Sequence, residues 1–222
     1  MRQKIHFDEI FRLLKHGLER YDNPVVSRTE WNRIIHSPYT TLISCILSLR
    51  TKDEVTEKAS IRLLKKYNTP EKMLKLSEKK IQSLIYPVGF YKTKAKRIRG
   101  ISKTLIEKCN GKVPDDFDEL LKLKGVGRKT ASIVMVYGHK KQGYLPIDTH
   151  CHRIPNRLGW IKTKTPEETE LKLRQILPSE YWDDFNHLFV TFGQTICVPV
   201  SPFCSRCPIK NYCKRVSVTN SR

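Results

Sequence analysis

The 222-residue sequence has no long apolar run and few acidic residues for its length. A membrane-spanning helix needs about 18 consecutive apolar residues. The longest apolar segment, residues 43–49, is short and contains Ser44, Cys45 and Ser48. The N-terminal residues interleave charged and apolar side chains, without the unbroken apolar segment of a secretion signal. We therefore expect a cytoplasmic protein that has no membrane partner.

The shortage of acidic residues leaves a large positive charge. Lys and Arg number 42 and Asp and Glu 22, which gives a formal net charge of +20. From Tyr91 to Lys108 seven residues are basic and one, Glu107, is acidic. Such an excess favours a polyanionic partner, and nucleic acid is the commonest one inside cells. A solubilising charge and the surface ion networks of a thermophile are the alternatives.

Strand-forming patterns are nearly missing as well. The residues 144–147 are the main extended-looking stretch, whereas apolar residues recur at helical steps of three and four elsewhere. Phe7, Ile10, Phe11, Leu14 and Leu18, for example, predict a first amphipathic helix. Thr165 and Glu168 have the spacing of a capping box at the start of another. The sequence predicts an all-α fold with about ten helices.

The seven cysteines do not form an even set for disulfides. Three are scattered, as small core residues commonly are. The other four lie in one C-terminal segment, separated by six, two and five residues: Cys197, Cys204, Cys207 and Cys213. Four thiols this close in an intracellular chain are typical of metal ligands, and both zinc and iron take such sites.

A glycine-containing turn joins two apolar helical patterns between residues 116 and 137. Gly125, Val126 and Gly127 form the turn, and Arg128 and Lys129 begin the second helix. Two glycines permit a tight turn, and a helix that opens there directs its N–H groups at a ligand such as phosphate. Backbone donors read no base, so this contact would anchor DNA without regard to sequence. A purely structural turn is the alternative.

Three motifs in order resemble the endonuclease III family of DNA glycosylases. They are the segment LKGVGRKTAS at 123–132, the segment LPIDTH at 145–150, and the spacing of the four cysteines. The resemblance extends from about Trp31 to Cys213. It implies two helical domains: a six-helix domain over 31–141 that contains the helix-hairpin-helix motif, and a discontinuous domain of 1–30 and 142–222 that contains an iron–sulfur loop. It also implies an active cleft between the domains.

The resemblance assigns catalysis to Lys129 and Asp148. A neutral lysine amine can attack C1′ of the sugar, expel the damaged base and form a Schiff base, from which β-elimination cuts the strand. A carboxylate can stabilise the positive charge that develops on the sugar and help to move a proton. The alternatives are a solvated lysine at a helix start and, for Asp148, a helix N-cap, which is compatible with catalysis. We place His150 among the DNA-binding residues.

The resemblance further implies that the four cysteines hold one 4Fe–4S cluster. Zinc is the alternative, although common zinc sites separate two cysteine pairs by a dozen or more residues. No dinucleotide-binding glycine motif is present that would supply a redox partner, so we expect a structural role for the cluster.

Two further residues are expected to fill the gap that an extruded nucleotide leaves in the duplex. Arg50 stands where bacterial relatives carry a gap-filling glutamine, and Phe90 matches a segment that supplies an apolar wedge. The alternatives are a surface ion-pair residue for Arg50 and a core position for Phe90.

Together these features predict a bifunctional DNA glycosylase and AP lyase of base excision repair. Its expected substrates are oxidised pyrimidines of the thymine glycol type and abasic sites in double-stranded DNA. We expect a monomer associated with the nucleoid of an archaeal or bacterial cytoplasm. The alternatives are a mismatch thymine or uracil glycosylase and, from another class, a non-catalytic iron–sulfur protein that binds DNA.

Overall fold

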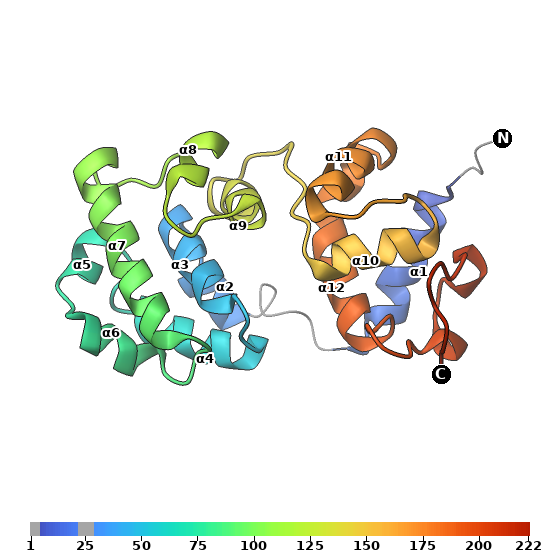
Figure 1. Ribbon diagram of the computed structural model, residues 1–222, viewed down its shortest axis with the longest axis horizontal. Helices are drawn as coiled ribbons and strands as arrows, with labels where there is room; N and C mark the ends of the chain where they lie inside the picture. Colours follow the sequence, from blue (N-terminus) through green and yellow to red (C-terminus); the bar gives the residue numbers. More distant parts are fainter. Residues whose placement is uncertain (1–4, 22–28) are drawn as a thin grey trace. The chain divides into compact units, whose positions relative to one another are not determined.

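The computed structural model describes residues 5–21 and 29–222, which form α-helices and connecting loops (Figure 1). Within these ranges no β-strand occurs, and the all-α prediction is confirmed. The α-helices are α1 (Phe7–Leu18), α2 (Thr29–Ile34), α3 (Pro38–Ser48), α4 (Asp53–Leu64), α5 (Pro70–Leu74), α6 (Glu78–Ile85), α7 (Tyr91–Cys109), α8 (Phe117–Lys122), α9 (Arg128–Ile133), α10 (Thr149–Leu158), α11 (Pro166–Ile176) and α12 (Trp182–Thr195).

The chain divides into two compact units. One consists of Met1–Pro24 with Leu145–Arg222, and the other of Val25–Tyr144. The divisions thus fall after residues 24 and 144, where the sequence suggested 30 and 141. In its described part the second unit has eight α-helices, α2–α9, rather than the expected six. The extra helices are short, because caps and turns interrupt the apolar pattern at α5 and α8.

The second unit is built around α3. Residues 39–47 of this helix are buried without interruption, so α3 has no polar face. It packs against α4, α7, α9 and the π-helical turn Val134–Gly138 that continues α9. The long helix α7 lies against α5 and α6 and buries Ala95, Ile98 and Leu105 in the same core. This packing holds the starts of α4, α7 and α9 on a rigid frame.

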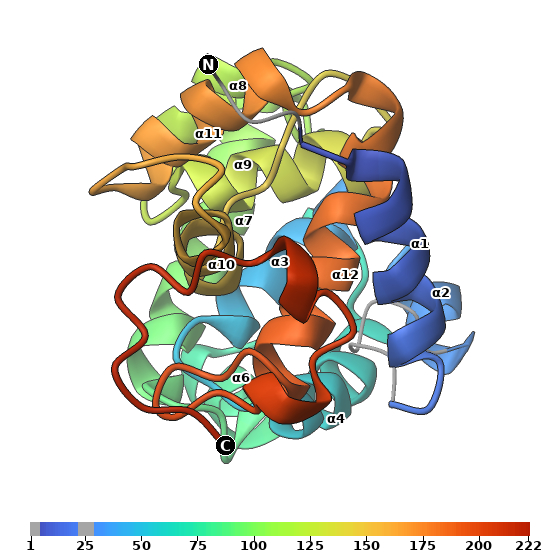
Figure 2. The same cartoon turned by 90° about the vertical axis from the view of Figure 1, so that its right-hand side faces the viewer.

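The first unit pairs the N-terminal helix with the C-terminal part of the chain. The apolar stripe of α1, residues Ile10, Phe11, Leu14 and Leu18, is buried as the periodicity predicts. Helix α1 runs beside α12 in both views (Figures 1 and 2). Phe11 and Phe189 of these helices have ring centroids 6.0 Å apart. Helix α10 packs against α11 and α12 and is thereby fixed in this core.

Side-chain caps set several helix starts. Asp148 and Thr165 accept backbone N–H groups at the starts of α10 and α11. Of the two bonds of the predicted capping box, the Thr165 side chain accepts the Glu168 backbone N–H as expected. The prediction of the second bond, from the Thr165 backbone N–H to the Glu168 carboxylate, is wrong. The Glu168 carboxylate accepts from the backbone N–H of Lys164 at 2.8 Å, one residue before the expected donor. The reach of Glu168 from the first turn of α11 accounts for this shift.

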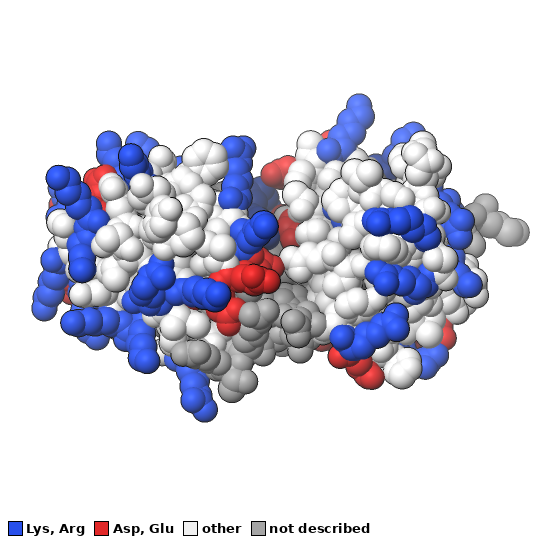
Figure 3. All heavy atoms as spheres, turned by 90° about the horizontal axis from the view of Figure 1, so that it is seen from below, with Lys and Arg blue, Asp and Glu red and all other residues white. Residues whose placement is uncertain are grey.

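Most of the charged side chains lie on the surface. Lys and Arg side chains are spread over the faces displayed in Figure 3, and acidic side chains are fewer. No helix among the described residues is long and apolar enough to cross a membrane.

Candidate active site and metal centre

The glycine turn between α8 and α9 forms a tight hairpin. Gly125 has φ +87°, a conformation that favours glycine, and Val126 donates its backbone N–H to the Leu123 carbonyl at 2.9 Å. A side chain on Gly125 would collide with Arg97 of α7. Gly127 is the N-cap of α9, and a Cβ there would meet open space. The hairpin therefore presents exposed backbone, while the buried Val126 side chain anchors it to the core.

Lys129 lies in the first turn of α9, directly after this hairpin. Its neighbours Thr130, Ala131 and Ser132 are buried, whereas Lys129 itself is exposed. Burial raises the pKa of the Cys45 thiol on α3 to about 12, and the positive charge of Lys129 opposes that rise. Lys129 is thus accessible on a helix whose other side is buried and packs against α3.

Asp148 is the N-cap of α10 in the other unit. Its Oδ1 accepts the backbone N–H groups of His150 and Cys151, each at 2.8 Å. The expected capping role is therefore confirmed, and it fixes the orientation of the carboxylate at the start of a buried helix. Asp148 as a residue is only partly buried.

The residues after Asp148 point in different directions. His150 Nδ1 lies 3.1 Å from Arg153 Nη2, whereas His152 Nδ1 lies 2.6 Å from the Thr169 hydroxyl of α11. The imidazole of His150 also packs so closely on Gly193 of α12 that a side chain there would collide with it. His150 is thus held inside its unit by two elements, and its assignment to DNA binding stays a prediction.

The four clustered cysteines surround one cavity in the C-terminal segment. All four line it, together with Ile154, Leu158, Phe192 and Ile196, so its walls combine sulfur and apolar carbon. Burial, together with the charges of the other three cysteines, raises the pKa of the Cys207 thiol to about 12, although a backbone hydrogen bond at Ile209 opposes the rise. The four cysteines therefore lie around one cavity, and their assignment as metal ligands stays a prediction.

The cysteines line the cavity without forming a compact ligand group. Among the described residues, no group of three or more His, Cys, Asp or Glu side chains is gathered closely enough for a single metal ion. N–H groups donate to the sulfurs: Arg157 Nη1 lies 3.5 Å from Cys197 Sγ, and the Arg215 backbone nitrogen lies 3.4 Å from Cys213 Sγ. N–H donors of this kind stabilise thiolate ligands.

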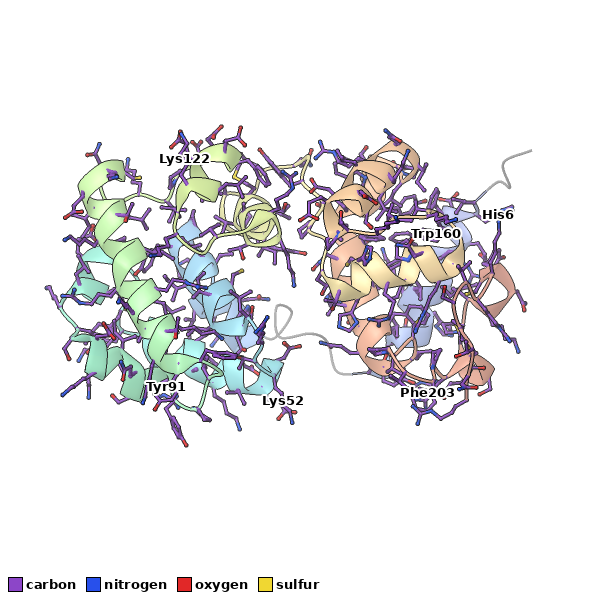
Figure 4. All side chains as sticks on the ribbon, in the orientation of Figure 1. His6, Lys52, Tyr91, Lys122, Trp160 and Phe203 are labelled. Carbon is purple, nitrogen blue, oxygen red and sulfur yellow. The ribbon has the colours of Figure 1, made fainter. Side chains whose placement is uncertain are left out.

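The first cysteine loop is tied to α10 by two arginines. Arg157 donates to the carbonyls of Val198 and Pro199, at 2.7 and 2.5 Å. Arg153 donates to the carbonyls of Gly193 and Cys197, at 3.3 and 2.7 Å. Helix α10 therefore carries Asp148 at its start and holds the cysteine loop along its length. Phe203, labelled in Figure 4, lies in this loop. The guanidinium groups of Arg206 and Arg222 lie over its ring.

The two expected gap-filling residues lie on neighbouring loops of the second unit. Phe90 is 64% exposed, so its alternative assignment to the core is wrong. Arg50 is also exposed, and its Cζ lies 5.9 Å from the centroid of the Phe90 ring. Tyr91 follows Phe90, and Lys52 comes two residues after Arg50; both labels lie at the lower end of this unit in Figure 4.

Comparison with known proteins agrees with this set of motifs. Residues 43–179 match the family described as the HhH-GPD superfamily of base excision DNA repair proteins. Over 197 residues the chain is 48% identical to endonuclease III of Thermotoga maritima, and the match covers 89% of this chain and 92% of that protein. The chain belongs to the endonuclease III family. It is thus a base excision repair enzyme of the DNA glycosylase and AP lyase class.

Solved structures give the same relationship. A trapped endonuclease III–DNA covalent intermediate superposes with a TM-score of 0.81 at 31% identity, covering 97% of each chain. A thermostable thymine-DNA glycosylase superposes with a TM-score of 0.77 at 25% identity, covering 94% of this chain and 93% of that one. The fold of this endonuclease III family member is therefore shared over nearly its whole length.

The sequence does not single out three basic residues whose side chains donate to backbone carbonyls: Lys94, Arg153 and Arg157. Each is one basic residue among 42, and nothing in its immediate sequence sets it apart. The signal that could have drawn attention to Lys94 is its place among apolar residues at a buried helical step, with Ala95 and Ile98. Arg153 and Arg157 are four residues apart, which places them on one face of α10.

Proposed function

We propose that this enzyme removes oxidised pyrimidines of the thymine glycol type from double-stranded DNA and then cleaves the abasic strand through a lysine Schiff base. The observation that carries the proposal is the accessible Lys129, which begins a helix directly after the Gly125–Gly127 turn. The likeness to a trapped endonuclease III–DNA covalent intermediate supports it, since that protein was captured while covalently joined to DNA.

Lys129 is the nucleophile in this scheme. Its amine attacks C1′ of the damaged nucleotide, and the bond between C1′ and the base breaks, so the base leaves with the bonding electron pair and takes up a proton. The sugar opens and the amine becomes a protonated Schiff base. Loss of a 2′ proton then expels the 3′ phosphate by β-elimination. The buried side of α9 keeps the Lys129 backbone fixed during these steps.

Asp148 supplies the negative charge that this chemistry requires. The bond to the base breaks with positive charge developing on the sugar, and a fixed carboxylate stabilises that charge. The same group accepts and returns protons as the amine changes its protonation state. The two backbone N–H groups that hold Asp148 Oδ1 keep its orientation constant, so no reorganisation is needed when the charge develops.

The hairpin anchors the DNA backbone in this proposal. Gly125, Val126 and Gly127 offer backbone N–H groups at the start of a helix, the arrangement that binds phosphate oxygens. Because nothing stands beside the Cα of Gly127, a phosphate has room to approach. Arg128 lies next to this position, with its guanidinium 5.0 Å from the Phe117 ring, and adds charge to the same place.

Cys197, Cys204, Cys207 and Cys213 would hold one 4Fe–4S cluster. The residues fit this group, because four thiols line one cavity with apolar walls. When bound, the cluster supplies a covalent cross-link between segments of the C-terminal region. The protein residues do the rest: Arg153 and Arg157 hold the first cysteine loop against α10.

A mismatch thymine glycosylase is the second candidate function. It is favoured by the likeness to a thymine-DNA glycosylase at 25% identity. The higher identity to endonuclease III proteins, up to 48% here, favours oxidised pyrimidines instead. We further propose that the enzyme acts as a monomer in a bacterial or archaeal cytoplasm, where chromosomal DNA is directly accessible.

One set of duplexes tests the proposal. The purified enzyme is incubated with four labelled duplexes that contain thymine glycol, uracil, a G·T mismatch or an abasic site, and strand cleavage is measured. Cleavage of the thymine glycol and abasic duplexes is the expected result. Cleavage that is confined to the mismatch duplex and the abasic duplex would support the second candidate. Binding without cleavage of any duplex would indicate a non-catalytic iron–sulfur protein.

A further inference from the structure

Two loops at one end of the second unit hold strained backbone positions. Arg50, between α3 and α4, has φ +53°, and Phe90, between α6 and α7, has φ +58°. For a residue with a large side chain, this left-handed backbone conformation costs about 1–2 kcal/mol of conformational energy. Such positions persist only where the surroundings fix them. Something in the structure therefore holds these two loops in place.

The side chain of Lys94 spans the two loops. Lys94 is 4% exposed and lies in the first turn of α7, where its backbone N–H donates to the Phe90 carbonyl at 3.0 Å. Its ammonium group donates to the Leu47 carbonyl at 2.8 Å, the Leu49 carbonyl at 2.5 Å and the Thr51 hydroxyl at 2.9 Å. An ammonium group has three donors, and all three are used here. The backbone of Lys94 thus contacts one loop and its side chain the other.

Thr51 and Gly89 complete the connection. The Thr51 hydroxyl accepts the backbone N–H of Gly89 at 3.2 Å while it also accepts from Lys94. A Cβ on Gly89 would lie 2.7 Å from the Arg50 carbonyl oxygen, so the two loops approach as closely as a glycine allows. Consequently, the residue before Phe90 contacts Arg50 itself, and any shift of one loop moves the other.

We infer that Lys94 is a positioning residue that sets the spacing of Arg50 and Phe90, so that both enter the gap left by an extruded nucleotide together. This inference rests on the proposed function, which assigns Arg50 and Phe90 to that gap. Lys94 itself is buried, so its role is indirect. It acts through the backbone of the loop that carries Arg50 and of the helix that starts at Phe90.

The electrostatics indicate that packing alone does not explain Lys94. Burial and, to a smaller extent, the positive charge of Arg97 lower the pKa of Lys94 to about 8. The charged form is therefore disfavoured here relative to water. An apolar side chain of similar length would avoid this cost if the position only filled space. The ammonium group contributes what an apolar side chain lacks, three directed bonds to two carbonyls and a hydroxyl.

The test compares Lys94→Met with Lys75→Met, which removes one exposed lysine charge from another part of the same unit. The readout is the fluorescence of 2-aminopurine placed opposite a tetrahydrofuran abasic analogue in duplex DNA. Insertion of side chains at the gap unstacks this base and raises its fluorescence, and no catalytic step is required. We expect wild type and Lys75→Met to give the full rise and Lys94→Met to lose most of it.

Base excision from a thymine glycol duplex, followed in single turnover, gives the second readout. Lys94→Met should slow excision ~10- to 100-fold, the effect of losing charge-assisted hydrogen bonds. In a background that also carries Arg50→Ala and Phe90→Ala, adding Lys94→Met should change the rate less than about twofold, because coupled residues are not additive. Thr51→Val removes the bridging hydroxyl and should reduce the excision rate by a smaller factor. This variant replaces Lys94→Met in the test if Lys94→Met does not fold.

Two results would overturn the inference. One is wild-type fluorescence and excision in both Lys94→Met and Thr51→Val. The other is that Lys94→Met lowers the excision rate by the same factor in the wild-type background and in the background that carries Arg50→Ala and Phe90→Ala. That result would indicate a general structural role. Failure of the proposed function gives a different result, since wild type itself would then leave thymine glycol and abasic duplexes uncut.

Discussion

Arg153 donates from Nη2 to the backbone carbonyl of Cys197 across 2.7 Å, and so joins the helix that Asp148 caps to the first of four clustered cysteines. The same nitrogen lies 3.1 Å from His150 Nδ1 and 3.3 Å from the Gly193 carbonyl. Burial lowers the pKa of the Arg153 guanidinium, but its usual value is so high that it stays charged. One charged group therefore organises three segments of its unit.

Replacing Arg153 should weaken that unit. Arg153→Met leaves the Cys197 and Gly193 carbonyls without this donor, and the free energy of unfolding should fall by about 2 kcal/mol, as for hydrogen bonds to a charged group. Urea denaturation measures the change. Arg206→Met serves as the control, because the exposed Arg206 makes a single longer bond of 3.4 Å to the Thr195 carbonyl. Equal denaturation midpoints for Arg153→Met and Arg206→Met would contradict the assignment.

Removing the charge of Asp148 should affect chemistry more than stability. In Asp148→Asn the amide oxygen still accepts the two N–H groups of the cap, so the free energy of unfolding should change by less than about 1 kcal/mol. The rate of base excision should fall at least ~100-fold, because the developing positive charge loses its partner. Asp116→Asn is the matched control, since Asp116 caps α8 through two similar bonds. Comparable excision rates in the two variants would refute a catalytic Asp148.

The four cysteines should bind iron and sulfide. Protein purified without oxygen should be brown and contain about four iron atoms and four sulfides per chain, the content of a 4Fe–4S cluster. Cys204→Ser should lose colour and metal. Cys109→Ser, at the end of α7 in the other unit, should retain both. Colourless protein that contains one zinc ion per chain would show that the cluster assignment is wrong.

The sequence predicted the elements of this fold well, because its helices follow local rules. The apolar stripe of α1 and the cap at Asp148 depend on residues within one or two turns, and both occur as expected. The capping box at Thr165 failed for an equally local reason: Glu168 has two backbone N–H groups within reach and bonds to that of Lys164. Helix number was underestimated, since short helices such as α5 leave little periodicity to detect.

Contacts between residues that are far apart in the chain could not be predicted from the sequence. Lys94 and Leu49 are 45 positions apart, and Arg153 and Cys197 are 44 apart. Each pair depends on how helices pack, and any of the many basic residues could have filled either role. The left-handed backbone of Arg50 and Phe90 is another such case. Neither residue type favours that conformation, so it arises from tertiary contacts and not from propensity.

The buried charge of Lys94 should make stability depend on pH. Below about pH 8 the side chain is charged in both folded and unfolded chains, and the full cost of burial is present. Between about pH 8 and the unfolded value near 10.4, the unfolded chain binds the extra proton, so the folded state gains stability as pH rises. Urea denaturation of wild type and Lys94→Met at pH 7 and pH 10 measures this. Between pH 7 and pH 10 the free energy of unfolding of the wild type should rise relative to that of Lys94→Met. If the difference between the two proteins is the same at both pH values, the buried charge is contradicted.

The most direct test of the account is borohydride trapping of Lys129 on DNA. Borohydride reduces a Schiff base to a stable bond, so wild type incubated with an abasic duplex should form a covalent protein–DNA adduct. Lys129→Gln should form none, while its stability stays within about 0.5 kcal/mol of wild type because the side chain is exposed. Lys122→Gln, a change of the exposed lysine that pairs with Glu119 on α8, should trap as wild type does. Trapping by Lys129→Gln at the wild-type level would contradict the central claim that Lys129 is the nucleophile.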